Sequence, residues 1–328
     1  MKKKYTAWFA GAFVLLTLAG CTAQRQPQDI LPELTSAPTA TPLPGPTEPP
    51  VPQPITEDVA IESPAEYAIQ TTITLPTDGE DWPLVVFCHG FTGNRRGDGH
   101  FPRVARQLAA RGIACAALDF AGNGDSELPF TNYTLSGMYD DIETVIAYMR
   151  ENYSVSSDKL GLVGHSMGGR VVSLHLSDAV TAAALWSPAN NPGADGFEFL
   201  AHSKAEREAL LQQAKADGQV DLPTWGVTIS DTFLEEMSES DPCAVLEEYQ
   251  GDVLVAFTAG DAEVLSEDTI ELTLDALKAR DVSFVDLSEA FPDATHNYAA
   301  LPESNITGTE VCDRIEKATV AFFANALL

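Results

Sequence analysis

Basic residues are scarce in this chain. Its 328 residues include 19 lysines and arginines against 48 aspartates and glutamates, which gives a formal net charge of −29 at pH 7. Binding to nucleic acid, or to an anionic membrane surface, needs a basic patch, so this balance argues against both kinds of partner. The acidity is typical of a soluble, exported protein.

Cysteine is also scarce, and its positions are scattered. The five cysteines and six histidines form no cluster with zinc-ligand spacing, and no glycine-rich motif for phosphate or dinucleotide binding occurs. We therefore expect no metal and no cofactor. Cys88 and Cys115 lie in apolar runs and are predicted to be buried thiols. Cys243 and Cys312 could pair in an exported protein, but their spacing leaves this open.

The apolar run near the N-terminus is too short to span a bilayer, which needs about 20 residues. It covers residues 7–19 and follows three lysines, as in a signal peptide. It ends in Leu18-Ala19-Gly20-Cys21, which resembles the signal of bacterial lipoproteins, in which the cysteine is lipidated. We predict a signal peptide over residues 1–20 and a lipid anchor on Cys21 that holds the protein on the outside of the bacterial cell envelope. An ordinary signal peptide is the alternative, and cell fractionation of a Cys21→Ala variant distinguishes the two.

Apolar residues are also rare in the segment that follows. Residues 27–54 are rich in proline, threonine and glutamate, a composition that cannot bury enough surface to fold. We predict a disordered linker over residues 21–58 and one catalytic domain over residues 59–328. An enzyme anchored by a lipid needs such a spacer to clear the envelope.

The rest of the chain alternates between strand-like and helix-like segments. Continuous apolar runs such as Leu84–His89 (LVVFCH) and Asp252–Thr258 (DVLVAFT) are typical of strands buried on both faces. Helix-like segments such as residues 101–111 and 135–151 separate these runs. The alternation predicts an α/β fold with a mostly parallel central sheet and helices on both faces. The active site of such a fold lies beyond the carboxyl ends of the strands.

Residues 160–169 read LGLVGHSMGG and contain the pattern Gly-x-Ser-x-Gly. In the nucleophile elbow, a serine occupies a strained turn between a strand and a helix, which lifts its hydroxyl above the sheet edge. Gly164 and Gly168 would allow the tight turn and the close approach of neighbouring chains. We predict Ser166 as the nucleophile. A simple glycine-rich turn is the alternative.

A carboxylate and a histidine follow the serine, each after a later predicted strand. Serine alone is a poor nucleophile, so a histidine must take its proton and a carboxylate must hold the imidazole. Asp261 and His296 are predicted for these roles, in the chain order serine, acid, histidine. Glu263 is the alternative acid.

The strand at residues 84–89 ends in His89-Gly90-Phe91-Thr92-Gly93-Asn94. A histidine-glycine turn at this place supplies half of an oxyanion hole. The predicted donors are the backbone N–H groups of Phe91 and Met167. His89 itself is predicted to fix the turn rather than to act as a base.

Taken together, these motifs resemble the α/β-hydrolase superfamily and, within it, the bacterial cinnamoyl/feruloyl esterases. The resemblance covers roughly residues 60–328 and rests on HGFTGN, GHSMGG, the DFAGNGDS stretch that begins at Asp119, and the residues Asp261 and His296. It implies a metal-free serine esterase that cleaves a small-molecule ester through an acyl-enzyme. One departure is Thr258, where the family usually has glycine three residues before the aspartate.

Residues 189–250 interrupt the alternation after the sixth strand. We predict that they form a cap over the serine and that Trp225 and Phe233 line an acyl pocket there. Because fold does not fix substrate, a monoacylglycerol lipase and a serine peptidase are alternatives. A non-catalytic, ligand-binding lipoprotein would need a broken triad. The acyl group, the alcohol and the oligomeric state are left open.

Overall fold

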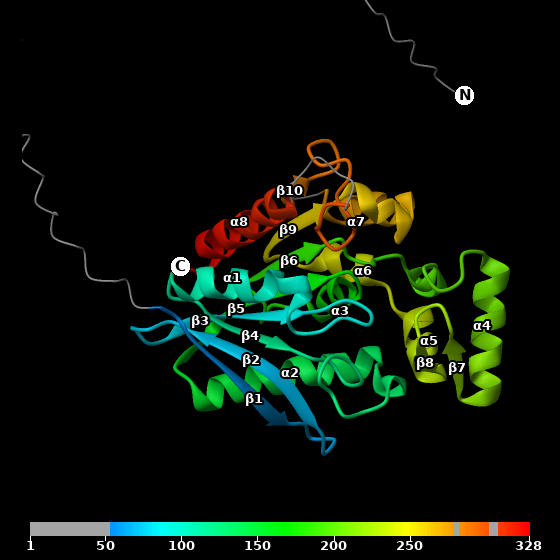
Figure 1. The fold of residues 1–328 in the computed structure, drawn as a ribbon, viewed down its shortest axis with the longest axis horizontal. Helices are drawn as coiled ribbons and strands as arrows, with labels where there is room; N and C mark the ends of the chain where they lie inside the picture. Colours follow the sequence, from blue (N-terminus) through cyan, green and yellow to red (C-terminus); the bar gives the residue numbers. More distant parts are fainter. Residues whose placement is uncertain (1–52, 279–281, 302–307) are drawn as a thin grey trace, which may run out of the picture. The chain divides into compact units, whose positions relative to one another are not determined.

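An eight-stranded sheet forms the centre of the protein (Figure 1). The computed structural model describes residues 53–278, 282–301 and 308–328. The predicted signal peptide, Cys21 and residues 21–52 of the predicted linker lie outside the described residues and stay predictions. Within the described ranges, no helix is both long and apolar enough to cross a membrane.

The order of the strands across the sheet is β1-β2-β4-β3-β5-β6-β9-β10. The pairings of β1 with β2 and of β2 with β4 are antiparallel, and the others are parallel. The predicted α/β fold with a mostly parallel sheet is thereby confirmed. The strands are β1 (Ile55–Glu62), β2 (Ala68–Leu75), β3 (Trp82–Cys88), β4 (Ala114–Leu118), β5 (Val155–His165), β6 (Ala182–Trp186), β9 (Asp252–Phe257) and β10 (Ser283–Asp286).

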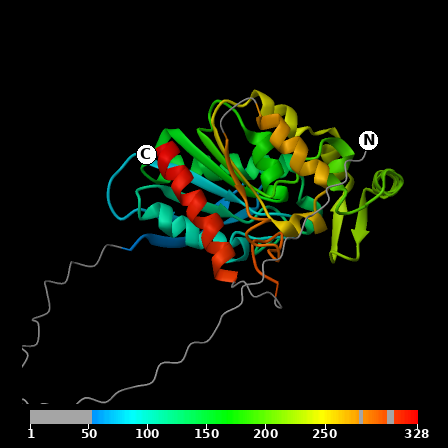
Figure 2. The ribbon, with the colours of Figure 1, turned by 90° about the horizontal axis from the view of Figure 1, so that it is seen from above.

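Helices cover both faces of the sheet. The major ones are α1 (His100–Ala109), α2 (Leu135–Asn152), α3 (Met167–His175), α7 (Glu267–Leu277) and α8 (Gly308–Leu327), with 3₁₀ turns η1 (Gly97–Gly99), η2 (Phe130–Asn132) and η4 (Ala259–Glu263). Figure 1 draws α1 and α8 on one side of the sheet and α2 on the other, and Figure 2 shows α8 crossing its face.

Strand β3 shows why the central strands are apolar at every position. Its side chains alternate between two cores, because successive residues of a strand point to opposite faces. Val85 and Phe87 belong to the core under α1 and α8. Leu84 and Val86 belong to the core under α2 and α3.

Strand β1 begins at Ile55, earlier than the predicted start of the catalytic domain at residue 59. Its residues pair with β2 from Ile55 opposite Leu75 to Glu62 opposite Ala68. Residues 55–58 are therefore part of the sheet and not of the linker. The strand has only one buried side chain, Ile61, so its sequence lacks the apolar run that marks the central strands.

The chain between β6 and β9 forms a lobe beyond the carboxyl ends of the parallel strands (Figure 1). The lobe contains η3 (Gly193–Phe197), α4 (Lys204–Asp217), the two-stranded sheet of β7 (Gln219–Leu222) and β8 (Val227–Ser230), α5 (Asp231–Glu239) and α6 (Pro242–Glu248). Here we call residues 189–250 the cap, in agreement with the predicted position after the sixth strand.

A buried arginine ties the cap to the helix that follows Ser166. The guanidinium of Arg170 donates to the carbonyl oxygens of Ala189 at 2.9 Å and Asn191 at 2.7 Å, and to the carbonyl oxygen of Ser240 at 3.2 Å. Its relative exposure is 0%. Burial lowers the pKa of Arg170 to about 10, so it remains a cation at neutral pH.

The four cysteines of the described ranges are free thiols. Cys88 and Cys115 are buried in core strands, and burial raises the pKa of each thiol. Cys243 and Cys312 do not form a disulfide. Cys243 donates from its Sγ to the carbonyl oxygen of Asn190, and Cys312 lies on α8.

Candidate active site

Ser166 occupies the turn between β5 and α3 in a strained backbone conformation. Its φ of 56° and ψ of −117° are rare for a residue with a side chain, and its neighbours hold it there. Its N–H donates to the carbonyl oxygen of Trp186 at 2.9 Å, and its carbonyl oxygen accepts from the N–H groups of Ala189 and Arg170 at 3.1 Å each. This is the geometry of a nucleophile elbow at the carboxyl end of a strand.

The two glycines of the elbow motif leave no room for a side chain. A methyl group on Gly164 would collide with the backbone of Gly168, and one on Gly168 would collide with the carbonyl oxygens of Cys88 and His89. The turn is therefore close both to itself and to the end of β3. The structure gives the predicted reason for glycine at each position.

Asp261 and His296 form a hydrogen-bonded pair. Asp261 lies in η4, directly after β9, and is completely buried. Its Oδ1 is 2.6 Å from Nδ1 of His296, which lies in the loop after β10. Glu263, the alternative acid, has an exposed side chain on the cavity wall. The structure thus places Asp261, and not Glu263, against the imidazole.

The second carboxylate oxygen of Asp261 is held by two further donors. Its Oδ2 accepts from Ser187 Oγ at 2.8 Å and from the Thr258 N–H at 2.7 Å. Ser187 Oγ is also 2.9 Å from the hydroxyl of Tyr298, which donates to the carbonyl oxygen of Ala256. The acid therefore has little freedom to rotate away from the imidazole.

No sequence motif indicated that Ser187 and Tyr298 belong to the site. Both are fully buried, and Ser187 directly follows β6, whose parallel neighbour is β9. Only this strand order brings Ser187 beside Asp261. A sequence reading that fixed the order of the strands could have located Ser187, since polar residues at neighbouring carboxyl ends meet at the same edge of a sheet.

The threonine that replaces the usual glycine has a role in the structure. Thr258 Oγ1 donates to the carbonyl oxygen of Thr295 at 3.1 Å, next to His296. The N–H of Gly260 donates to the carbonyl oxygen of Ala294 at 2.8 Å. One side-chain and one backbone hydrogen bond thus join the turn with the acid to the loop with the histidine.

The remaining ring nitrogen of His296, Nε2, is buried and has no hydrogen-bond partner within the described part of the chain. His296 and Ser166 line the same cavity. The neighbouring His165 contacts the same loop, with its Nε2 at 3.0 Å from the carbonyl oxygen of His296. Burial lowers the pKa of His165 to about 3, so the ring is neutral and Nε2 carries the donated proton.

His89 fixes the turn that leads to Phe91. Its Nε2 accepts from the N–H of Phe120 at 3.1 Å, so its proton is on Nδ1, which donates to the carbonyl oxygen of Gly90 at 2.8 Å. Burial lowers the pKa of His89 to about 4. Both ring nitrogens have hydrogen-bond partners, Gly90 and Phe120, which leaves neither available as a base.

The predicted oxyanion donors, Phe91 and Met167, line the same cavity as Ser166. Met167 begins α3, so its N–H has no acceptor within the helix. The turn before Phe91 touches the nucleophile, because a methyl group on Gly90 would lie 3.0 Å from Ser166 Cβ.

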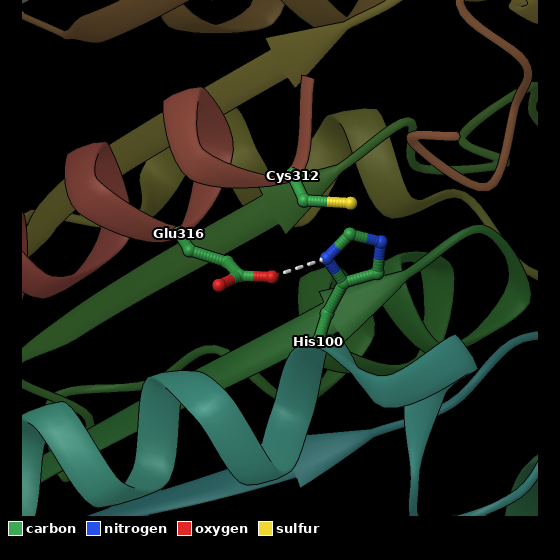
Figure 3. A group of neighbouring side chains, drawn as sticks. All are labelled: His100, Cys312 and Glu316. Atoms are coloured by element: carbon green, nitrogen blue, oxygen red, sulfur yellow. Dashed lines mark hydrogen bonds and ion pairs between the residues drawn. The ribbon is translucent and has the colours of Figure 1, made fainter. Parts of the chain in front are cut away.

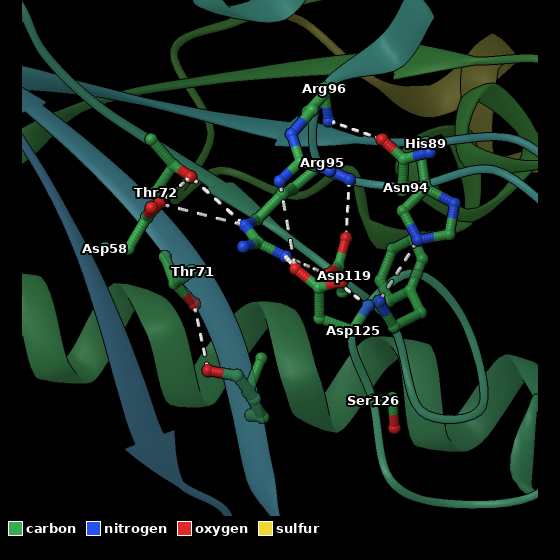
Figure 4. Close-up of polar contacts among 12 residues, drawn as sticks. Asp58, Thr71, Thr72, His89, Asn94, Arg95, Arg96, Asp119, Asp125 and Ser126 are labelled. Carbon is green, nitrogen blue, oxygen red and sulfur yellow. Dashed lines mark hydrogen bonds and ion pairs between the residues drawn. The ribbon is translucent and has the colours of Figure 1, made fainter.

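A buried ion pair holds this oxyanion turn against the turn after β4 (Figure 4). Asp119 accepts from the N–H of Arg95 at 2.6 Å and from the N–H of Asp125 at 2.9 Å, and it pairs with the Arg95 guanidinium. The same guanidinium lies 2.8 Å from Asp125. Both acidic residues of the DFAGNGDS stretch thus have a structural role.

The cavity above Ser166 has a volume of about 490 Å³ and two unlike walls. Its apolar wall consists of Phe91, Phe199 and Trp225, whose rings meet edge to face with centroids 5.2 to 5.6 Å apart. Its polar wall includes Asn94, Asp98, Glu263 and Asn297.

Phe233 does not line the cavity, in contrast to its predicted place in the acyl pocket. It lies on α5 with no exposed surface, and its ring centroid is 6.0 Å from that of Phe91. The side chain faces the core because it belongs to the buried stripe of α5. It supports the apolar wall from behind.

A comparison with protein families identifies this arrangement. The model of the Alpha/beta hydrolase family matches residues 85–307, about two thirds of the chain. The chain belongs to the alpha/beta hydrolase family. The predicted resemblance to this superfamily is confirmed, and the protein is a hydrolase of this class.

Solved structures of hydrolases share the fold at low sequence identity. Est1E from Butyrivibrio proteoclasticus, determined with ferulic acid bound, has a TM-score of 0.59 at 19% identity, and the match covers 81% of this chain and 99% of Est1E. The esterase domain of a Rhodothermus marinus protein has a TM-score of 0.57 at 19% identity, with coverage of 84% and 100%. These likenesses support the resemblance to bacterial esterases at the level of the fold.

Curated relatives match over shorter segments. The quorum-quenching protein AidA of Acinetobacter baumannii is 30% identical over 124 residues, which cover 37% of this chain and 39% of AidA. A 2-succinyl-6-hydroxy-2,4-cyclohexadiene-1-carboxylate synthase of Enterobacter sp. is 33% identical over 94 residues, or 29% and 32% of the two chains. The chain thus aligns with about a third of the length of these relatives.

Proposed function

We propose that this protein is a serine carboxylesterase that works through an acyl-enzyme. One observation carries the proposal. His296 is hydrogen bonded through Nδ1 to the buried Asp261, its Nε2 has no partner among the described residues, and the residue lines the same cavity as Ser166. An imidazole held in this way is oriented to take a proton from a serine hydroxyl.

In the proposed reaction, Ser166 Oγ attacks the acyl carbon and its proton passes to Nε2 of His296. The tetrahedral intermediate collapses when the ester C–O bond breaks, and His296 returns the proton to the departing alkoxide. Water then attacks the acyl-enzyme with His296 as the base, which releases the acid and restores the serine. Asp261 stays ionised and stabilises the imidazolium in both halves.

The negative charge on the substrate oxygen would be held by the backbone N–H groups of Phe91 and Met167. Such donors stabilise the transition state more than the ground state, and loss of one typically costs about 10²–10³ in rate. The support for this assignment is that both groups lie beside Ser166 and line its cavity. The turn of Phe91 is fixed by His89 and by the Arg95–Asp119 ion pair.

For the acyl group, we propose a flat aromatic acid of the cinnamoyl or feruloyl type. The apolar wall of Phe91, Phe199 and Trp225 offers ring faces and edges that favour an aromatic partner. Est1E, which shares the fold, holds ferulic acid in its structure. The polar wall carries the carboxylates of Asp98 and Glu263, so it favours a neutral, hydroxyl-rich alcohol over an anionic one.

The experiment is a fluorophosphonate labelling assay combined with a substrate panel. Ser166→Ala should lose labelling and about 10⁶ in kcat, while its circular dichroism spectrum stays that of the wild type. Ser173→Ala is the matched control, because Ser173 lies on the same helix but does not line the cavity. Its hydroxyl donates to the carbonyl oxygen of Gly169 and accepts from the side-chain amide of Asn190.

The substrate panel compares methyl ferulate, p-nitrophenyl acetate, monoglycerides and aminoacyl amides. The highest kcat/KM is expected on methyl ferulate. A preference for monoglycerides or amides would move the assignment to a lipase or a peptidase. Labelling that persists in Ser166→Ala, or a wild-type protein that is neither labelled nor active, would contradict the proposal itself.

A further inference from the structure

A buried histidine outside the triad touches the loop that carries His296. His100 is the first residue of α1 and has a relative exposure of 4%. Its Nε2 lies 3.1 Å from the carbonyl oxygen of Asn297, the residue next to His296. Its Nδ1 lies 2.8 Å from Oε1 of Glu316 on α8, as Figure 3 shows. Neither the motifs nor the proposed chemistry use this histidine.

His100 lies between two hydrogen-bond acceptors, the carbonyl oxygen of Asn297 beside Nε2 and the carboxylate of Glu316 beside Nδ1. A carbonyl oxygen can only accept, so Nε2–H donates to Asn297. The guanidinium of Arg103 lies beside the same Nδ1, at 3.3 Å. Glu316 is suited to a cationic partner. Burial by itself raises the pKa of Glu316, but hydrogen bonds from His100 and Arg103 outweigh that effect and hold the pKa below its ordinary value.

Helix α8 holds the loop at two successive residues. Glu316 reaches Asn297 through His100, and Cys312, one turn earlier, donates from its Sγ to the carbonyl oxygen of Tyr298 at 3.5 Å. The helix is itself fixed, because Val311 and Ile315 are fully buried in the core that it shares with α1. The loop of His296 is therefore attached to a rigid support.

The same three side chains also resemble a metal-binding set. The ligand atoms of His100, Cys312 and Glu316 lie within 4.8 Å of one another, and zinc uses all three residue types. However, the guanidinium of Arg103 lies 2.7 Å from Glu316 Oε1 and 3.3 Å from His100 Nδ1. A fixed positive charge already occupies the place of a cation, which favours hydrogen bonding over metal binding here.

We propose that His100, held by Glu316, is a positioning residue that keeps the His296 loop in register with Ser166. The proposal rests on the proposed function, since the loop position affects the rate only if His296 is the base. Displacement of a catalytic group by about 1 Å can cost about 10² in rate. His100 does not line the cavity, so its loss should leave substrate binding unchanged.

The test compares steady-state kinetics of His100→Gln, Glu316→Gln and the double variant. Glutamine is neutral and cannot donate to two acceptors that lie on opposite sides of the imidazole. We expect His100→Gln to lower kcat about tenfold to a hundredfold, with KM nearly unchanged. Because the two side chains act as a unit, kcat of the double variant should be no lower than kcat of the less active single variant. If His100→Gln does not fold, the isosteric Glu316→Gln provides the test.

Thr319→Val is the matched control. Thr319 lies on the same buried face of α8, and its hydroxyl accepts from the indole N–H of Trp186 at 3.0 Å without touching the His296 loop. It should lower the melting temperature and leave kcat unchanged. If Thr319→Val loses as much kcat as His100→Gln, the effect of His100→Gln comes from general packing around α8 and not from the position of the His296 loop.

Two further measurements separate the possible failures. If His296→Ala is inactive while folded His100→Gln and Glu316→Gln stay within about twofold of the wild type, only the positioning role fails. If His296→Ala keeps its activity, the proposed function fails first. If dialysis against EDTA reproduces the loss of His100→Gln and Zn²⁺ restores the rate, the cluster binds a metal and the hydrogen-bonding role is wrong.

Discussion

The catalytic side and the cap side of the cavity are held in place by different interactions. On the side of the proposed triad, the Asp261 carboxylate takes hydrogen bonds from His296, Ser187 and Thr258, all at 2.8 Å or less. On the cap side, Phe199 and Trp225 are positioned by ring contacts with Phe91 and with each other.

This contrast separates chemistry from selectivity. Hydrogen bonds are directional, so a buried polar network specifies one arrangement, and loss of a single member leaves its partners unsatisfied. Ring contacts act mainly through the apolar area that they bury, and their preferred edge-to-face geometry adds only about 0.5–1.5 kcal/mol. Phe91 belongs to both sides, because its N–H is a proposed oxyanion donor and its ring is the centre of the apolar wall.

The largest effect is expected at the acid. Asp261→Asn keeps the shape of the side chain but presents an amide to His296 and removes the charge that stabilises the imidazolium. We expect kcat to fall by about 10⁴, with little change in KM. Steady-state kinetics on a p-nitrophenyl ester measure the loss.

Glu263→Gln is the control for this prediction, because Glu263 lines the cavity with an exposed side chain. It should cost less than about tenfold, as expected of a group that only adjusts the local field. A larger loss for Glu263→Gln than for Asp261→Asn in folded proteins would move the acid to Glu263.

The proposed triad also shows how much of the site could be predicted from the sequence. Ser166, Asp261 and His296 could be placed at strand ends because motif spacing and the alternation of strands and helices are local signals. Ser187 and His100 could not, since each is brought to the site by the order of strands or by the packing of α1 on α8. These are long-range contacts that one sequence does not display.

Burial was harder to predict than element type. The central strands were recognisable because both faces are apolar, whereas β1 was not, since it is an edge strand with one buried residue. The same limit applies in the cap. Trp225 and Phe233 are both aromatic residues in the same segment, and only the packing of α5 decides that Phe233 faces the core.

The second prediction concerns the pH dependence of stability on the oxyanion side. Burial lowers the pKa of His89 from 6.5 to about 4. Between these pH values the unfolded chain binds a proton at His89, whereas the folded protein keeps the imidazole neutral. Its contribution to stability is therefore complete above pH 6.5 and is lost as the pH falls from 6.5 to 4. The shift corresponds to about 3 kcal/mol.

His89→Gln tests this assignment. Glutamine can keep one donor and one acceptor in the turn, but it takes up no proton in this range. The free energy of unfolding, measured by urea denaturation at several pH values, should fall less steeply between pH 6.5 and 4 in the variant than in the wild type. If the free energy of unfolding falls equally steeply with pH in both proteins, His89 is not the group that causes the pH dependence.

The smallest effect is expected on the cap side. Trp225 is a half-buried ring on the cavity wall, so Trp225→Ala removes apolar surface from the proposed acyl site without touching the polar network. A lost hydrophobic contact changes discrimination between substrates only modestly, and we expect kcat/KM on methyl ferulate to fall about tenfold. The rate on p-nitrophenyl acetate should stay nearly constant, because an acetyl group does not reach the ring wall.

Phe233→Ala provides the contrast, since it removes a ring from behind the wall, and it should lower stability by about 3–5 kcal/mol and affect both substrates alike. If Trp225→Ala instead weakens both substrates equally, the apolar wall supports the cap and does not select the acyl group, and the separation between a rigid catalytic side and a selective cap side fails.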